Sequence, residues 1–180
     1  MEYPTKNTTP WLHWVVDNFL TTECLNELKL IDSALSQTLP GRRYGSERLF
    51  VDETNAQLYP ELFKLYQSML FGEYKTFFEE HTKESFDGLF PRLEVISDIG
   101  EFSINPHTDR KEKKLTAIVY TDHTKLYPAT ALDETTRIEA KDNRCFFFIP
   151  SDDTWHSYPP TTFETVRRCL HINYWTYEVE

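Results

Sequence analysis

The strongest constraint on the fold is a change of pattern near Leu89, where helical periodicity gives way to a series of β-rich segments. After this point, short runs rich in Val, Ile, Phe and Tyr alternate with turn residues. Helices followed by a run of strands predict an α+β arrangement in separate layers. We expect strands at Arg92–Ile99, Leu115–Tyr120, Thr136–Ala140, Cys145–Ile149 and Val166–Tyr177.

The N-terminal half supplies one strand and two helices. Residues 1–10 read as a loose arm, and Trp11 to Val16 reads as extended. A first helix is expected to begin near Thr21 and to end at Pro40-Gly41. A second helix is expected from about Pro60 to about His81, because Pro suits the first turn of a helix.

Three side chains near the ends of predicted strands can converge on a metal ion. His107 and Asp109 are separated by one residue, and in an extended segment such side chains point to the same face. His156 follows a buried-looking strand and can supply a second imidazole. The His-x-Asp pair alone is a weak motif, so its position at a strand end carries the argument. Two His and one carboxylate on one side of a metal form the facial triad of non-heme Fe(II) oxygenases.

Composition narrows the classes of partner. The formal net charge of −10 argues against broad binding to a nucleic-acid backbone, which relies on Lys and Arg. The basic run Arg110-Lys111-Glu112-Lys113-Lys114 is the local exception, and we interpret it as a solvated loop. No apolar run approaches the length needed to span a membrane. Nothing in the sequence sets the oligomeric state.

The cysteines indicate a reducing compartment. Cys24, Cys145 and Cys169 are odd in number and irregularly spaced, which does not suggest a disulfide framework. The N-terminus also lacks the charged-then-apolar pattern of a signal peptide. We therefore expect a cytoplasmic protein, a setting that also suits Fe(II).

From Trp11 to Trp175 the chain resembles the 2-oxoglutarate- and Fe(II)-dependent oxygenases, in the branch that includes the prolyl hydroxylases. That family has the order His-x-Asp, a strand ending in Tyr, a distal His, then Arg-x-small. Here the order reads His107-Thr108-Asp109, Tyr120, His156 and Arg167-Arg168-Cys169. The family's Gly-Gly-x-Leu turn after the Tyr strand is absent, and residues 126–132 stand in its place.

The resemblance implies a double-stranded β-helix, or jelly roll, flanked by N-terminal helices. It implies one oxygenase domain over residues 1–180, with the strand and supporting helices in 11–88 and the jelly-roll core with the metal site in 89–180. Fe(II), 2-oxoglutarate and O₂ are the implied cofactor and co-substrates, with ascorbate as a further candidate. The implied reaction is hydroxylation of a C–H bond, with a prolyl residue of a peptide or protein as the leading substrate. A free amino acid or other small molecule is the alternative.

The resemblance also implies roles for individual residues. His107, Asp109 and His156 would bind the metal, and an Arg would bind the remote carboxylate of 2-oxoglutarate. Arg167 and Arg168 both fit that position. Arg167 is favoured because it alternates with polar residues, whereas Arg168 alternates with apolar residues suited to packing on helices. Tyr120 would hydrogen-bond the same carboxylate, unless it is a core aromatic residue.

Two other classes of protein stay open at this point. A cupin-like protein could bind a metal, such as Zn(II), without catalysing oxidation. It would keep His107, Asp109 and His156, but Arg167 would have no co-substrate to bind. In the second class, a binding module, all these residues would be structural, and three metal-ligating side chains would converge without a ligand.

Overall fold

The computed structural model describes residues 2–31, 46–121 and 130–177. The predicted end of the first helix at Pro40-Gly41, and most of the loop that replaces the family's glycine-rich turn, lie outside these ranges. The described elements, in chain order, are β1 (Thr5–Asn7), β2 (His13–Val16), α1 (Thr22–Leu30), β3 (Ser46–Val51), α2 (Pro60–Phe71), α3 (Glu73–Thr82), β4 (Phe90–His107), β5 (Lys113–Tyr120), β6 (Thr130–Ala131), β7 (Arg137–Ile138), β8 (Arg144–Phe148) and β9 (His156–Trp175).

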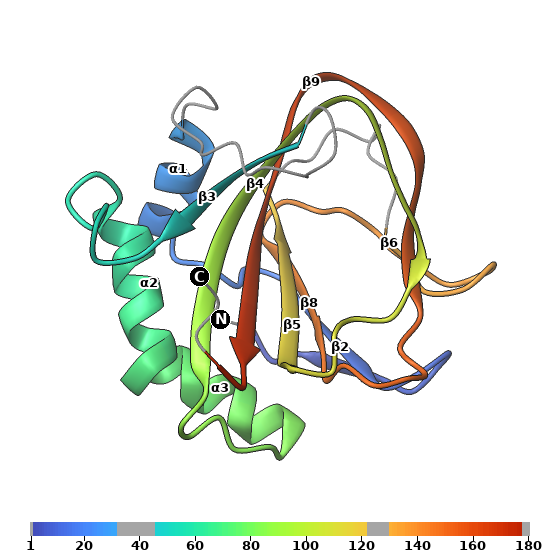
Figure 1. Cartoon of the computed structure of the whole chain (residues 1–180), viewed down its shortest axis with the longest axis horizontal. Helices are drawn as coiled ribbons and strands as arrows, with labels where there is room; N and C mark the ends of the chain where they lie inside the picture. Colours follow the sequence, from blue (N-terminus) through green and yellow to red (C-terminus); the bar gives the residue numbers. More distant parts are fainter. Residues whose placement is uncertain (1, 32–45, 122–129, 178–180) are drawn as a thin grey trace.

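The strands form an antiparallel jelly roll, which confirms the predicted fold class. Their main order is β1-β2-β8-β5-β9-β4-β3, and the short β6 pairs with β7 and with the start of β9. The two longest strands, β4 and β9, pair from Phe90–Trp175 to His107–His156, with irregularities of register on the way. Figure 1 shows both strands arching together over the top of the barrel, so each contributes to both walls.

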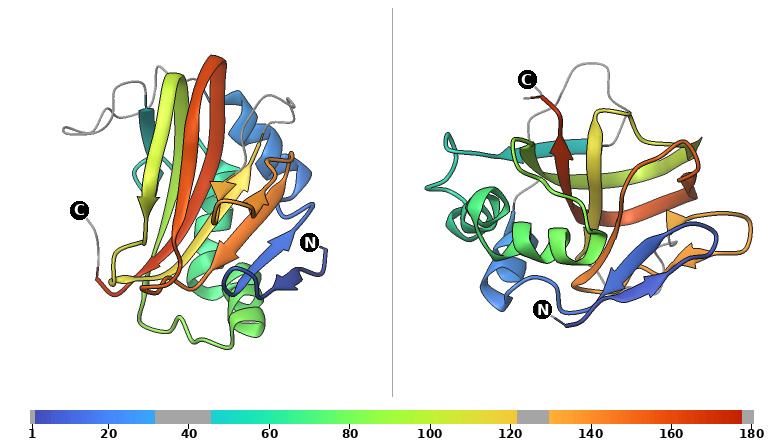
Figure 2. Two further views of the ribbon diagram at one scale, coloured as in Figure 1. Left: turned by 90° about the vertical axis from the view of Figure 1, so that its right-hand side faces the viewer. Right: turned by 90° about the horizontal axis from the view of Figure 1, so that it is seen from below.

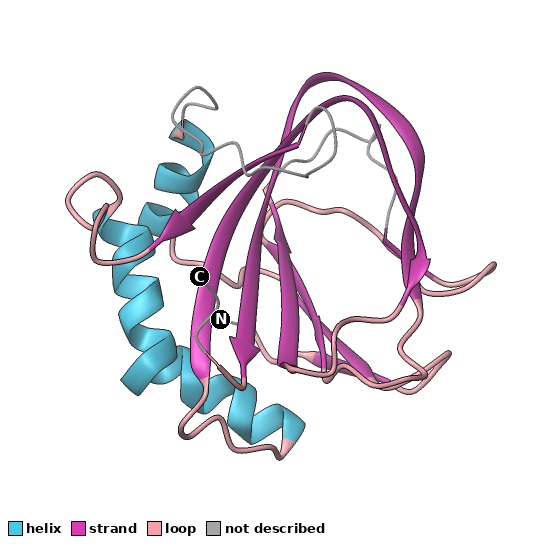
Figure 3. Cartoon of the chain, in the orientation of Figure 1, coloured by secondary structure: helices cyan, strands magenta, loops and turns pink. Residues whose placement is uncertain are grey.

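The helices lie together on one side of the strands (Figure 3), and the two perpendicular views of Figure 2 agree with this arrangement. Successive side chains of a strand point to opposite faces of the sheet, so every second residue can face the helices. On β9, Leu170, Ile172 and Tyr174 join the core cluster that contains Leu28 and Leu62 of the helices. The Tyr174 hydroxyl also donates a 2.6 Å hydrogen bond to the Met69 carbonyl in α2. The intervening residues of β9 therefore face the inside of the barrel.

The helix predicted from Pro60 to His81 is two helices, which is a correction to the sequence analysis. Gly72 is extended, with φ −120° and ψ −157°, and separates α2 from α3. The Ser68 hydroxyl accepts from the Tyr74 amide across this break at 3.2 Å. A Cβ atom at Gly72 would lie 2.6 Å from that hydroxyl, so the break depends on glycine.

The predicted loose arm is also corrected. Thr5–Asn7 forms the edge strand β1, whose residues pair with those of β2 from Thr5–Val15 to Asn7–His13. Backbone hydrogen bonds to the exposed edge of β2 order this segment. The polar sequence of the arm gives no apolar alternation that could have indicated a strand. Within the described ranges, no helix has the length and apolar character needed to cross a membrane.

Candidate metal centre

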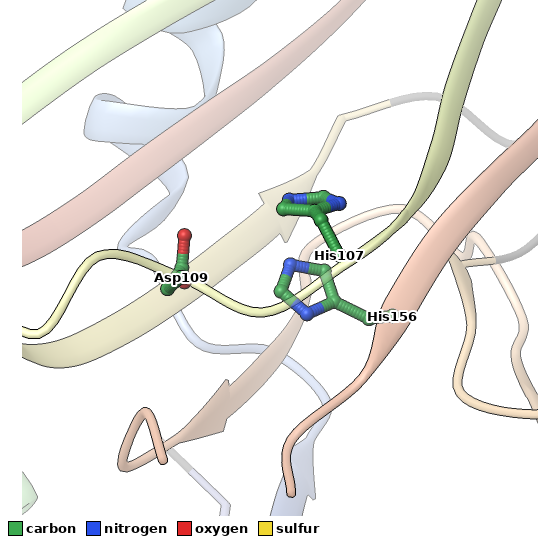
Figure 4. A group of neighbouring side chains, drawn as sticks. All are labelled: His107, Asp109 and His156. Atoms are coloured by element: carbon green, nitrogen blue, oxygen red, sulfur yellow. The ribbon is translucent and has the colours of Figure 1, made fainter. Parts of the chain in front are cut away.

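The structure brings His107, Asp109 and His156 together. One ligand atom from each of these side chains lies within 4.8 Å of the other two. His107 ends β4, His156 begins β9, and the two residues are partners in the β4–β9 ladder, with ring centroids 4.4 Å apart. Asp109 follows β4 by two residues. Figure 4 shows the three side chains projecting from these segments toward a common space.

Both imidazoles are oriented in the same way by their own backbone. Nδ1 of His107 lies 3.0 Å from the Asn105 carbonyl oxygen, and Nδ1 of His156 lies 3.0 Å from the Thr154 carbonyl oxygen. A carbonyl oxygen can only accept, so Nδ1 carries the proton in each ring. In the neutral imidazole, Nε2 then keeps its lone pair for a metal ion. Burial lowers the pKa of His156 despite the opposing charge of Asp109, which favours this neutral form.

Two donors hold the Asp109 carboxylate. The Lys113 ammonium lies 3.0 Å from Oδ1, and the Thr116 hydroxyl donates to Oδ2 at 2.6 Å. Burial alone would raise the pKa of Asp109, but Lys113, His156 and Thr116 together outweigh it and lower the pKa. Asp109 is therefore ionised at neutral pH, as a metal ligand must be.

This donor set fits Fe(II). Two neutral imidazole nitrogens and one carboxylate oxygen are the ligands of the non-heme Fe(II) triad, which leaves further positions open for other molecules. Zn(II) accepts the same types of ligand, so the donor set does not separate these two metals.

The triad lines one end of a cavity inside the barrel. The cavity has a volume of about 590 Å³, which lies within the usual range for ligand pockets. Its wall also contains Thr116, Thr130, Ile118 and Arg167. The cavity is therefore large enough for a small organic co-substrate beside a metal ion.

Arg167 and Arg168 lie on opposite faces of β9. Arg167 is buried in the cavity wall, and its Nη1 donates to Oδ2 of Asp98 at 2.6 Å. Its guanidinium also lies over the Tyr158 ring, 4.6 Å from the centroid. Arg168 instead donates to the Lys29 carbonyl in α1, at 3.1 Å. Of the two candidates, Arg167 alone lines the cavity, and its role in binding a co-substrate stays a prediction.

Tyr120 ends β5, as the sequence indicates, but it lies behind the cavity wall. Its side chain is buried and its hydroxyl lies 2.7 Å from the Thr130 hydroxyl. Burial raises the pKa of Tyr120 to about 12, so the phenol stays neutral. Thr130 lines the cavity, and Tyr120 contacts the site through it. A direct hydrogen bond from Tyr120 to a co-substrate stays a prediction.

Several residues of the site were missed by the sequence analysis. Thr116 and Asp98 contact predicted site residues, and the charged residues Arg48, Arg92 and Glu94 also line the cavity. The available signal was alternation, because Glu94, Ile96 and Asp98 share the inward face of β4. Which partner each acid contacts depends on the pairing of β4 with β3 and β9, and no local pattern encodes this pairing.

Comparisons with known proteins identify solved structures that share this fold. Neither a family model nor a curated protein matches the sequence. Among solved structures, a prolyl 4-hydroxylase from Phytophthora capsici has a TM-score of 0.68 at 16% identity over 91% of this chain. This chain covers 58% of that protein, which is less than two thirds of its length. A member of the 2OG-Fe(II) oxygenase family from Burkholderia pseudomallei has a TM-score of 0.65 at 11% identity, covering 92% of this chain and 84% of its own.

A third solved structure includes a peptide. It is a prolyl hydroxylase from Trichoplax adhaerens in complex with a peptide fragment of the hypoxia inducible factor oxygen degradation domain. Its TM-score is 0.59 at 14% identity, covering 91% of this chain and 83% of its own. The chain therefore has the fold of the 2-oxoglutarate- and Fe(II)-dependent oxygenases, with prolyl 4-hydroxylases prominent among its structural neighbours and with the His-x-Asp…His triad intact.

Proposed function

We propose that the protein is an Fe(II)- and 2-oxoglutarate-dependent dioxygenase that hydroxylates a C–H bond. The observation that carries this proposal is the convergence of His107, Asp109 and His156 on one point at the end of an internal cavity. When bound, iron and 2-oxoglutarate would supply the oxidising chemistry, and the protein would position them and limit the access of water. His107, Asp109 and His156 would hold the metal, and Arg167 would bind the remote carboxylate of 2-oxoglutarate.

A prolyl residue of a peptide or protein is the substrate we propose first. The support is the structural likeness to prolyl hydroxylases, one of them solved with a peptide bound. A free amino acid or other small molecule is the alternative. Ascorbate, as a reductant that maintains Fe(II), belongs to the same proposal. A cytoplasmic location is proposed because the three cysteines are buried and none forms a disulfide.

A metal-binding protein without oxygenase activity is the second candidate. It is favoured by the contact between Arg167 and Asp98, because a carboxylate already lies against the proposed co-substrate anchor. For the oxygenase, 2-oxoglutarate must compete with Asp98 for the guanidinium or share it. For the metal-binding protein, the ion pair would be purely structural.

The test is succinate formation from 2-oxoglutarate by the iron-loaded protein, first without and then with prolyl peptides. We expect slow succinate formation that is lost in Asp109→Ala and His107→Ala. In Arg167→Gln the KM for 2-oxoglutarate should rise at least about tenfold, because a charged hydrogen bond contributes about 1.5–3 kcal/mol. Arg168→Gln is the matched control and should leave this KM unchanged.

A separate measurement tests the alternative, a metal-binding protein without oxygenase activity. Calorimetry under anaerobic conditions would titrate 2-oxoglutarate into protein loaded with Mn(II), which binds without turnover. Metal binding without any binding of 2-oxoglutarate would replace the oxygenase with the metal-binding protein. Retention of succinate formation in Asp109→Ala would remove the metal centre from the proposal.

A further inference from the structure

The wall of the cavity holds two arginines, Arg48 and Arg92, that contact neither the proposed metal ligands nor the proposed co-substrate anchor. We propose that Arg48 and Arg92, with Lys113 beside them, form an anion subsite that binds a carboxylate of the primary substrate. This inference rests on the proposed function and specifies its substrate class. The carboxylate would belong to an acidic residue close to the oxidised residue of a peptide, or to a free amino acid.

The cluster contains two guanidinium groups and one carboxylate. Arg48 contacts Glu94 through Nη1, and Arg92 contacts it through Nε at 3.0 Å. The Glu94 side chain is 3% exposed, and those of Arg48 and Arg92 are 27% and 16% exposed. Two half-buried cations share one buried anion, so the cluster keeps a positive charge. Nε of Arg48 is buried and has no hydrogen-bond partner within the described residues.

Aromatic rings fix the direction of Arg92. Its guanidinium lies 4.3 Å from the centroid of the Phe50 ring and 5.9 Å from that of Trp175. The Lys113 ammonium lies 5.5 Å from the same Trp175 ring. Rings on the flanks restrict the guanidinium and displace water from it, which strengthens its attraction for an anion.

The subsite lies at the level of the metal centre. Arg92 on β4 pairs with Asn173 on β9, and Asn173 pairs with Thr116 on β5. Thr116 donates to the metal-binding carboxylate of Asp109. Arg92 and Thr116 are thus two strand spacings apart, roughly 10 Å. This distance corresponds to about three residues of an extended peptide, so the acidic group must be close to the oxidised carbon.

The proposed co-substrate anchor, Arg167, lies near the middle of β9. Arg92 pairs with Asn173, and Arg167 lies six residues before Asn173 on the same strand, which is roughly 20 Å along the strand. Two positions for carboxylates, separated by this distance in one cavity, fit two different molecules. We therefore assign the Arg167 position to 2-oxoglutarate and the Arg48–Arg92 position to the primary substrate.

The charge of the whole cavity supports this assignment. Among the residues that the structure describes, its wall contains five cationic side chains (Arg48, Arg92, Arg110, Lys113, Arg167) and three carboxylates (Glu94, Asp98, Asp109), an excess of two positive charges. Burial, with Arg48, Lys113 and Arg167 nearby, lowers the pKa of His171 well below its ordinary value, so His171 adds no charge. The charge of Fe(II) balances that of the 2-oxoglutarate dianion, so the loaded cavity stays positive inside a chain of net charge −10. This field favours an anionic substrate.

The test compares three blocked peptides in which aspartate, asparagine or lysine is the second residue after proline, together with free L-proline. Their dissociation constants are measured by calorimetry on protein loaded with Zn(II) and 2-oxoglutarate, so that no turnover is needed. We expect the aspartate peptide or free proline to bind at least about tenfold more tightly than the asparagine peptide, and the lysine peptide to bind most weakly. Preference for free proline over the aspartate peptide would identify an amino-acid substrate.

Substitutions then identify the side chains responsible for the preference for aspartate over asparagine. Arg92→Gln and Arg48→Gln should each reduce the aspartate-over-asparagine ratio toward one, and Arg92→Lys should keep part of it. Arg137→Gln, on the exposed position of β7, makes the same change of charge away from the cavity and should keep the full ratio. Circular dichroism and thermal unfolding verify that each variant is folded.

Two results would overturn the subsite: equal or absent binding of the anionic and neutral probes, or a loss in Arg92→Gln that falls on 2-oxoglutarate instead. Succinate formation by the wild type is measured separately. Its absence alongside intact anion selectivity would reject the oxygenase and leave the anion subsite in place.

Discussion

The substitution Thr116→Val tests whether the environment of Asp109 was built for a metal ligand. The Thr116 hydroxyl donates to Oδ2 of Asp109 at 2.6 Å, and Thr116 is only 3% exposed, so water cannot readily replace it. Valine keeps the size and branching of the side chain while it removes the donor. Loss of a hydrogen bond that orients a metal ligand typically reduces metal affinity by 10–100-fold. We expect an effect of this size, about 1.4–2.7 kcal/mol.

The assay is calorimetric titration of the apoprotein with Mn(II), which forms the same type of complex without oxidising. Thr121→Val is the matched control, because the Thr121 hydroxyl is also buried and donates to the Arg168 carbonyl at 2.8 Å. The control should bind Mn(II) with the affinity of the wild type. A dissociation constant for Thr116→Val within about twofold of the wild type would refute the reasoning, as would an equal loss in the control.

Three further substitutions test the framework around the site by urea unfolding. The Arg144 guanidinium holds the pKa of Asp17 at about 2, so their contact stabilises the fold above pH 4 and is lost as the pH falls toward 2. Asp17→Asn should therefore cost about 1 kcal/mol at pH 6 and much less at pH 2, where half of the Asp17 carboxyl groups are protonated; an equal cost at both would contradict this. Asn143→Ala removes two buried hydrogen bonds to Leu20 at a positive φ of 57° and should cost about 2–3 kcal/mol, with Asn143→Gly milder by about 1 kcal/mol. Phe147→Ala opens a fully buried site in the core and should cost about 3–5 kcal/mol; a cost below 1 kcal/mol would show that the core collapses around it.

The sequence predicted those parts of the site that depend on short-range geometry. His107 and Asp109 lie near one another because they are two residues apart, and Arg167 faces the cavity because side chains alternate along a strand. The start of α1 was also predictable, because Thr is a favoured helix cap. In the structure the Thr21 hydroxyl accepts a hydrogen bond from the Cys24 amide.

Features that depend on long-range pairing were not predictable. Asp98 meets Arg167 only because β4 and β9 pair in one particular register. The strand predicted at Arg92–Ile99 continues to His107, because pairing with β9 holds the chain extended through Gly100 and Pro106. Propensity alone disfavours both residues in a strand interior, so tertiary pairing overrides it.

The pairing of β4 with β9 along their whole length has a consequence for the order of folding. His107 and His156 are the terminal rung of this ladder, at the end opposite Phe90 and Trp175. Contacts between residues so far apart in sequence form slowly, and the ends of a ladder open most readily. A metal ion would thus bind a chain that is already paired and would then close its frayed end. Amide hydrogen exchange at Ser157 and Tyr158 should slow on metal binding, while exchange at Leu170 and Ile172 should stay governed by global unfolding.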